Sequence, residues 1–202
     1  MPIKVEFHFD FGSPNSYYCH QVIPAIEKRI GVKFDYVPIL LGGVFKATNN
    51  KSPMEAFAGI KNKSEYNSLE TARFIEKYNI DKFVMNPNFP VNTLYIMRGV
   101  IYAQKSGIGT EYINAMYQCM WEKGLNMADP AVIQQALANV NLPAEEIVAA
   151  TAEPEIKQAL IENTMSTVER GTFGSPTFFV GDEIYFGKDR LTDVEEEILA
   201  QS

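Results

Sequence analysis

The sequence predicts an α/β protein in which a helical block interrupts a small sheet. Residues 3–38 are patterned as strand, helix, strand, and residues 177–200 are patterned as two strands and a helix. The stretch between them carries apolar residues at helical spacing. With 202 residues, the chain has room for one domain with a large insertion or for two small domains.

The N-terminal unit begins with Ile3–Asp10, where apolar and polar residues alternate as in a half-buried strand. Pro14 then begins a helix at a position where its missing N–H is harmless. Gly31 follows the last apolar residue of that helix, in the position that a C-cap glycine favours. Val32–Pro38 alternates again, so we expect a second strand, parallel to the first and joined to it by a right-handed crossover.

The middle of the chain predicts only helices. Several of them begin with proline and acidic residues, which are typical of a first helical turn. The expected helices are Glu65–Tyr78, Pro90–Ser106, Thr110–Glu122, Pro130–Ala138 and Glu153–Arg170.

The C-terminal part returns to strands. Thr177–Val180 and Glu183–Phe186 are joined by the tight Gly181-Asp182 connection of a hairpin. Asp189–Ala200 follows as a short amphipathic helix. We therefore expect one domain from residues 1–40 and 172–202, with residues 41–171 as a helical insertion domain.

The charge balance limits the partners. Eighteen basic residues against twenty-five acidic ones give a net charge of −7, which argues against a nucleic-acid phosphate track. No stretch reaches the roughly 18–20 apolar residues of a membrane span, and no signal-peptide pattern precedes the first strand. Cys19 and Cys119 form no CxxC and are expected to be core thiols. We expect a cytoplasmic protein without nucleic-acid or membrane partners.

The most informative motif is Ser13-Pro-Asn-Ser16, directly after the first strand. A thiol-disulfide enzyme carries Cys-Pro-x-Cys at such a strand-to-helix turn, because the helix N-terminus stabilises a thiolate. With serine at both positions the turn forms no disulfide and passes no electrons. It still directs a hydroxyl and amide donors towards a thiolate brought from outside.

A second motif, Gly174-Ser-Pro-Thr177, precedes the third strand. Taken alone, Pro176 is a trans proline that starts a strand. Together with the serine turn it favours a thioredoxin-like fold with a cis proline, where the Ser175 backbone pairs with a peptide-like ligand. The fold class is then α/β, thioredoxin-like with a large all-helical insertion.

Other polar residues have weaker signals. Lys46, Asn50 and Lys63 lie on a polar segment after the second strand, where lysines are usually solvated and asparagines form turns, although such a loop can also cover a ligand. Asp189 suits a helix cap as well as a ligand site. The two histidines, His8 and His20, have no partner at metal or triad spacing, so we expect no metal.

The chain resembles 2-hydroxychromene-2-carboxylate isomerases, which belong with kappa-class glutathione transferases in the DsbA-like branch of the thioredoxin superfamily. The resemblance covers nearly the whole length. It rests on Asp10-Phe-Gly-Ser-Pro-Asn-Ser-Tyr17, Leu41–Asn50, Asn86–Leu94 with Met97-Arg98, and Gly174–Val180 through Phe186–Leu191. The third of these motifs favours the isomerases over the kappa transferases.

The resemblance implies glutathione as cofactor, no metal and a homodimer. It places Ser13 at the glutathione sulfur, Ser175 at the cysteinyl unit, and Asn50 and Lys63 at the glycyl end. Lys188 and Asp189 match the pair at the γ-glutamyl end.

The implied reaction belongs to aromatic hydrocarbon degradation and rotates a double bond between 2-hydroxychromene-2-carboxylate and trans-o-hydroxybenzylidenepyruvate. The charge that develops on the substrate needs a donor, for which Lys46 and then Arg98 are the candidates. A kappa-like transferase acting on electrophiles and a redox-inactive DsbA-like binding protein are the alternatives.

Overall fold

The computed structural model describes residues 3–201 and contains one mixed four-stranded sheet. The strands are β1 (Val5–Phe9), β2 (Asp35–Pro38), β3 (Thr177–Val180) and β4 (Glu183–Phe186), in the order β2-β1-β3-β4. β1 pairs in parallel with β2 and antiparallel with β3, and β3 and β4 form the antiparallel hairpin. The C-terminal end of β1 and the N-terminal end of β3 therefore lie side by side at the same end of the sheet, with His8 opposite Thr177.

Helices make up most of the rest. The first group is α1 (Pro14–Ile30), α2 (Leu41–Thr48), α3 (Pro53–Ala56), α4 (Lys63–Tyr78) and α5 (Leu94–Lys105). The second group is α6 (Gly109–Trp121), α7 (Pro130–Ala138), α8 (Ala144–Ala150), α9 (Pro154–Glu169) and α10 (Leu191–Gln201), preceded by the short 3-10 helix η1 (Lys188–Arg190).

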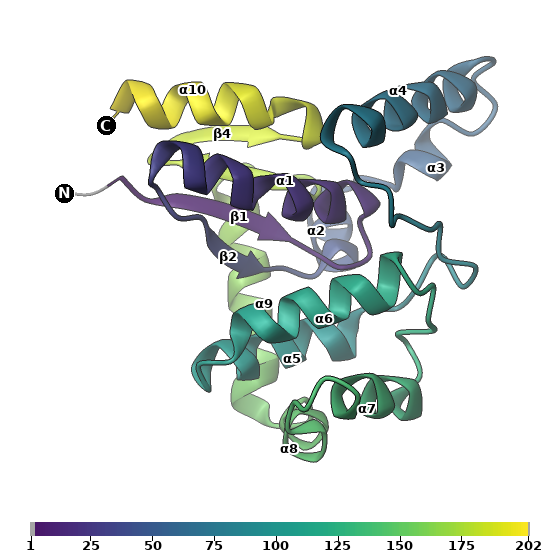
Figure 1. The fold of residues 1–202 in the computed structure, drawn as a ribbon, viewed down its shortest axis with the longest axis vertical. Helices are drawn as coiled ribbons and strands as arrows, with labels where there is room; N and C mark the ends of the chain where they lie inside the picture. Colours follow the sequence, from purple (N-terminus) through teal and green to yellow (C-terminus); the bar gives the residue numbers. More distant parts are fainter. Residues whose placement is uncertain (1–2, 202) are drawn as a thin grey trace.

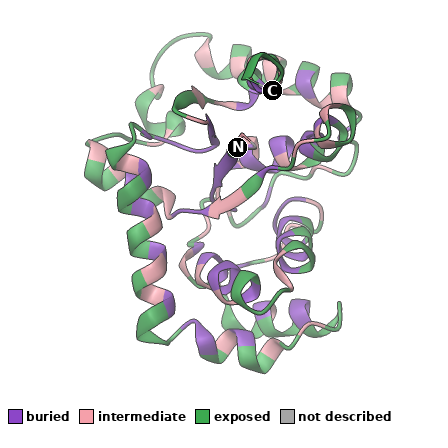
Figure 2. Cartoon of the chain, turned by 90° about the vertical axis from the view of Figure 1, so that its left-hand side faces the viewer, coloured by how far each residue is buried: buried purple, intermediate pink, exposed green. Residues whose placement is uncertain are grey.

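The sheet with α1 and α10 forms the upper part of the molecule in Figure 1, and α5 to α8 form the lower part. α9 runs between the two parts and reaches the sheet beside β2. Buried positions gather on one side of the helices (Figure 2) and in the two central strands, since β1 and β3 are buried along their whole length. The outer strands β2 and β4 are mostly half-buried or exposed. This is the predicted thioredoxin-like sheet with a helical insertion. Residues 41–171 contain no strand, all of them being described, and the exact domain boundaries stay a prediction.

Several predicted elements are confirmed in position. The two hairpin strands and helix α7 have the expected bounds, and α1 ends at Gly31 with a left-handed φ of 74°. Several other bounds differ by one or two residues, and three differences concern where an element begins. β2 begins at Asp35, three residues later than expected; α5 begins at Leu94 and not at Pro90; and η1 precedes the last helix.

The polar segment after β2 is also corrected, because Lys46 lies in helix α2 and not in a loop. Leu41-Gly-Gly43 is a poor helix former. The helix nevertheless starts there because the Leu41 N–H donates to the Asp10 carboxylate and the Leu40 N–H donates to the Thr164 hydroxyl. Gly43 allows α2 to approach α9 closely, since a Cβ at this position would lie 3.0 Å from Cγ2 of Thr164.

His20 is a half-buried histidine whose ring packs against the aromatic core. Its Nδ1 lies 2.9 Å from the Tyr36 hydroxyl, and its ring stacks on Tyr117 with 4.6 Å between the centroids. Burial lowers the pKa of His20 from 6.5 to about 4, and burial lowers the pKa of His8 to about 4 as well. The His8 ring is buried and packs edge-on against Phe179, with 4.9 Å between the centroids.

We predict that acid destabilises the protein partly through His20. The unfolded chain binds a proton below pH 6.5 and the folded chain only near pH 4, so stability is lost as the pH falls through this window. By pH 4.5 the loss from one such group is about 2–3 kcal/mol. Urea unfolding of wild type and His20→Gln at pH 7 and pH 4.5 measures it. The variant should lose less stability than wild type; an equal loss in both proteins contradicts the assignment.

Candidate functional site

The candidate site begins at the turn between β1 and α1. Ser13 is the N-cap of α1, with extended backbone and with its hydroxyl oxygen 3.3 Å from the Ser16 N–H. Pro14 occupies the first helical position, as expected. The first turn of α1 has no acidic side chain, so the positive end of the helix dipole is not offset within the helix.

The structure brings three serines together at this turn. The Ser13 hydroxyl donates to the Ser175 carbonyl over 2.9 Å, and the hydroxyls of Ser16 and Ser175 lie 2.8 Å apart. The Ser175–Pro176 bond is cis, as expected from the motif. All three side chains are buried.

Asp10 ties this turn to two other helices. One carboxylate oxygen accepts from the Gly12 N–H at 2.8 Å and from the Thr93 hydroxyl at 2.7 Å. The other oxygen accepts from the Leu41 N–H at 2.7 Å. Burial raises the pKa of Asp10, and the three donated hydrogen bonds act against that shift. The starts of α1, α2 and α5 are thus held by one side chain that is 1% exposed.

Among residues 3–201, no thiol lies at the serine turn, where the sulfur in contact is the Met97 thioether, 3.5 Å from the Phe11 N–H. The two free cysteines, Cys19 and Cys119, are both buried, and burial raises the pKa of each thiol. A thiol in that state is a poor nucleophile. The polar groups of the turn are therefore hydroxyls and backbone groups, which form hydrogen bonds.

Of the residues that the family resemblance assigns to the glycyl end, Asn50 lies beside the cis-proline loop. Its side-chain NH₂ donates to the Phe173 carbonyl over 2.8 Å, two residues before Ser175. Lys63 stands at the start of α4 with its ammonium 4.9 Å from the centre of the Phe57 ring. The contacts of the described residues do not connect Lys63 to the serine cluster.

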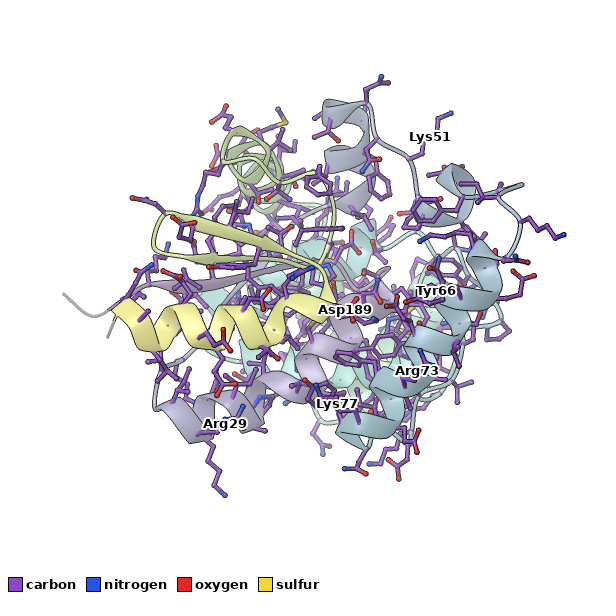
Figure 3. All side chains as sticks on the ribbon, turned by 90° about the horizontal axis from the view of Figure 1, so that it is seen from above. Arg29, Lys51, Tyr66, Arg73, Lys77 and Asp189 are labelled. Carbon is purple, nitrogen blue, oxygen red and sulfur yellow. The ribbon has the colours of Figure 1, made fainter. Side chains whose placement is uncertain are left out.

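Lys188 and Asp189 are paired with each other. The Lys188 ammonium is 2.6 Å from the Asp189 carboxylate and 5.0 Å from the centre of the Phe74 ring, and the lysine is buried. Both line a cavity of about 260 Å³ between η1 and α4, which also presents Arg73 and Lys77. Figure 3 shows Arg73 and Lys77 on α4, and Asp189 in η1, just before the first residue of α10.

The two substrate candidates lie in different settings. Lys46 is exposed on α2. It lines neither the cavity between η1 and α4 nor a second cavity between α2, α5 and α9. Arg98, on α5, is half-buried and faces this second cavity. Its Nε is buried without a hydrogen-bond partner among the described residues.

Sequence reasoning missed Asp10 and Thr93 as site residues. The available signal was a carboxylate at the end of a buried strand, three residues before the N-cap serine. In the same described residues, 3–201, no three His, Cys, Asp or Glu side chains group as metal ligands. Within that range, too, none of the helices has the length and apolar character of a membrane span.

Comparison with known proteins agrees with this geometry. The profile of the DsbA-like thioredoxin domain matches residues 4–199. A 2-hydroxychromene-2-carboxylate isomerase of Pseudomonas putida is 29% identical over 194 residues, which are 95% of this chain and 92% of that protein. Glutathione S-transferase kappa 1 of Caenorhabditis elegans is 24% identical, over 93% of this chain and 87% of its own.

A solved structure of a 2-hydroxychromene-2-carboxylate isomerase superposes with a TM-score of 0.84 at 25% identity. The match covers 98% of this chain and 95% of that structure. From the serine turn, the cis proline and these matches it follows that the chain belongs to the family of DsbA-like thioredoxin domains.

Proposed function

We propose that the protein is a glutathione-dependent isomerase that interconverts 2-hydroxychromene-2-carboxylate and trans-o-hydroxybenzylidenepyruvate. The observation that carries the proposal is the serine turn: Ser13, at the N-terminus of α1, lies 2.9 Å from the carbonyl next to the cis proline. The site has the form of a thiol site without a cysteine. The isomerases among the relatives support the reaction class.

The residues present fit glutathione. Ser175 offers a backbone carbonyl to the cysteinyl unit, and Asn50 lies beside the same loop. The cavity at Asp189 and Lys188 carries both signs of charge, which suits the ammonium and carboxylate of a γ-glutamyl end. Lys63 is proposed for the glycyl carboxylate on the strength of the family resemblance.

When bound, glutathione supplies a thiolate that adds to the conjugated double bond and leaves again, so that the bond rotates while it is single. The chain's part is electrostatic. The helix N-terminus and the Ser13 hydroxyl favour the thiolate, and one hydrogen bond to an anion contributes about 1.5–3 kcal/mol. Lys46 or Arg98 would hold the charge that develops on the substrate's carboxylate side.

The experiment follows isomerisation and free thiol in one reaction. The purified chain should isomerise the chromene carboxylate only when glutathione is added, and the thiol concentration should stay constant. Loss of thiol together with a conjugate would show a kappa-like transferase, the second candidate, which the match to the nematode enzyme favours. Absence of both reactions would leave a redox-inactive binding protein. We also propose a cytoplasmic homodimer, to be checked by fractionation and by solution mass.

A further inference from the structure

The second cavity lies at the starts of α2 and α5 and against α9. Its volume is about 140 Å³. Because whole small-molecule pockets measure about 300–1,000 Å³, this one has room for one end of a ligand. Its walls are mainly aliphatic and come from Leu40, Leu94, Leu160, Ile161 and Met165.

Two cations interrupt these apolar walls, Arg98 from α5 and Lys157 from α9. None of the described residues that line the cavity is acidic. The Arg98 guanidinium has one long hydrogen bond, 3.4 Å from Nη1 to the Thr151 carbonyl, and its buried Nε has no partner among the described residues. Leaving a buried donor without an acceptor costs free energy, so an anion that accepts from the guanidinium would be stabilised there.

Two helix N-termini also meet at the cavity. Leu40 is the N-cap of α2 and Leu94 is the first residue of α5, so both helices begin at the cavity. The Asp10 carboxylate already accepts from the Leu41 N–H and the Thr93 hydroxyl at these two helix starts. The positive charge available to a ligand's carboxylate therefore comes from Arg98 and Lys157. Lys46 stands near the other end of α2, outside the cavity lining.

The cavity is also tied to the serine turn. The Asp10 carboxylate bonds the N–H of Leu41 and the hydroxyl of Thr93, which adjoin Leu40 and Leu94 of the cavity wall. The same carboxylate bonds the Gly12 N–H, one residue before Ser13. A ligand that reaches from this cavity to the turn would therefore lie along the α2 and α5 helix starts.

We propose that this cavity binds the carboxylate end of a small aromatic acid, with Arg98 and Lys157 on the carboxylate and the aliphatic wall on the apolar part. The proposal rests on the proposed function, because it assigns the substrate's acidic end there. It selects Arg98 over Lys46 and adds Lys157, which sequence analysis did not single out.

The test measures binding without glutathione and without turnover. The probe is trans-cinnamate, and cinnamamide is its uncharged match. Wild type should bind cinnamate about tenfold or more tightly than cinnamamide, since the pair differs in one charge-assisted contact. Arg98→Met and Lys157→Met should each weaken cinnamate binding about tenfold and leave cinnamamide binding unchanged, whereas Arg98→Lys should restore part of the loss.

Lys105→Met is the matched control, because Lys105 is a lysine of α5 that pairs with Glu155 on the surface. It should leave cinnamate affinity unchanged. Methionine methyl NMR locates the ligand: the Met165 signal should shift on titration, and that of Met54, 64% exposed on α3, should not. Circular dichroism confirms that the variants fold.

Equal affinity for the acid and the amide overturns the proposal. The proposal is also wrong if Arg98→Met and Lys157→Met leave cinnamate affinity unchanged, or if the Met165 methyl signal does not shift on titration. The outcome is separable from that of the proposed function. Cinnamate binding through Arg98 in a chain that shows no isomerisation leaves the cavity assigned and the reaction wrong. If the chain catalyses isomerisation but Arg98→Met does not change cinnamate binding, the reaction is confirmed and the cavity assignment is wrong.

Discussion

Replacing Ser13 by alanine should lower the rate of glutathione-dependent isomerisation near neutral pH by roughly 10–100-fold. The lost hydroxyl is worth one charge-assisted hydrogen bond, so the pKa of the bound thiol should rise by roughly one to two units. The helix dipole and the backbone donors remain, and the rate should therefore recover in part at higher pH. Glutathione affinity should change less, since Asn50, Lys63, Ser175 and Asp189 are intact.

The measurement is the pH–rate profile of wild type and Ser13→Ala. Ser16→Ala is the matched control. The buried Ser16 hydroxyl contacts the hydroxyl of Ser175, whereas the Ser13 hydroxyl donates to the carbonyl of Ser175. The melting temperature of both variants must be followed, since an N-cap serine itself contributes about 0.5–2 kcal/mol to stability. Superimposable profiles for wild type and Ser13→Ala would assign thiolate stabilisation to the backbone amides.

Ser13→Cys gives an independent check on the position of the sulfur. It restores a thiol at the redox position of the turn. On addition of glutathione disulfide, the new thiolate should attack one sulfur, form the mixed disulfide and release the other glutathione as a thiolate. Mass spectrometry of the oxidised variant detects the added mass. Cys19 and Cys119 should stay unmodified, because both are buried with raised pKa.

The sequence predicted the elements whose signals are local. Pro14 and Gly31 mark the two ends of α1, and the tight turn at residues 181–182 sets the register of the hairpin. The serine turn indicated the candidate site, because serine stands at both positions where a thiol-disulfide enzyme carries cysteine, and the site's role stays a prediction.

Elements that depend on contacts distant in the sequence were missed. α2 contains two adjacent glycines, and its start depends on hydrogen bonds with Asp10 and Thr164, the latter 124 residues from Leu40. α5 begins at Leu94 and not at Pro90, directly after Thr93, whose hydroxyl bonds Asp10 83 residues away. Local propensity carries no information about such partners. Lys157 could not be singled out from the sequence for the same reason. It becomes a candidate ligand residue only because the fold places it at the same cavity as Arg98.

Removing the Asp10 carboxylate should therefore destabilise the protein more than most single changes. Asp10→Ala leaves three donors without their acceptor: the N–H groups of Gly12 and Leu41 and the hydroxyl of Thr93. An unpaired buried donor costs about 1–3 kcal/mol, and relief of the buried charge offsets part of the sum. We expect the free energy of unfolding to fall by about 3–5 kcal/mol.

Asp10→Asn separates the hydrogen bonds from the packing. The amide oxygen can keep the acceptor role towards Gly12 and Thr93, but the amide NH₂ then faces the Leu41 N–H, donor against donor. The loss should be about 1–3 kcal/mol. The exposed Asp35→Asn should stay within about 0.5 kcal/mol of wild type.

Urea unfolding of the three variants at pH 7 gives the series, and amide hydrogen exchange gives the location. In Asp10→Asn the protection of the first turn of α2 should fall most, because Leu41 is the donor that loses its acceptor. Equal stability of Asp10→Asn and wild type, or a loss of protection confined to α1, would mean that Asp10 does not hold the start of α2. The cavity at Leu40 would then owe its shape to the packing of α2 on α9 alone.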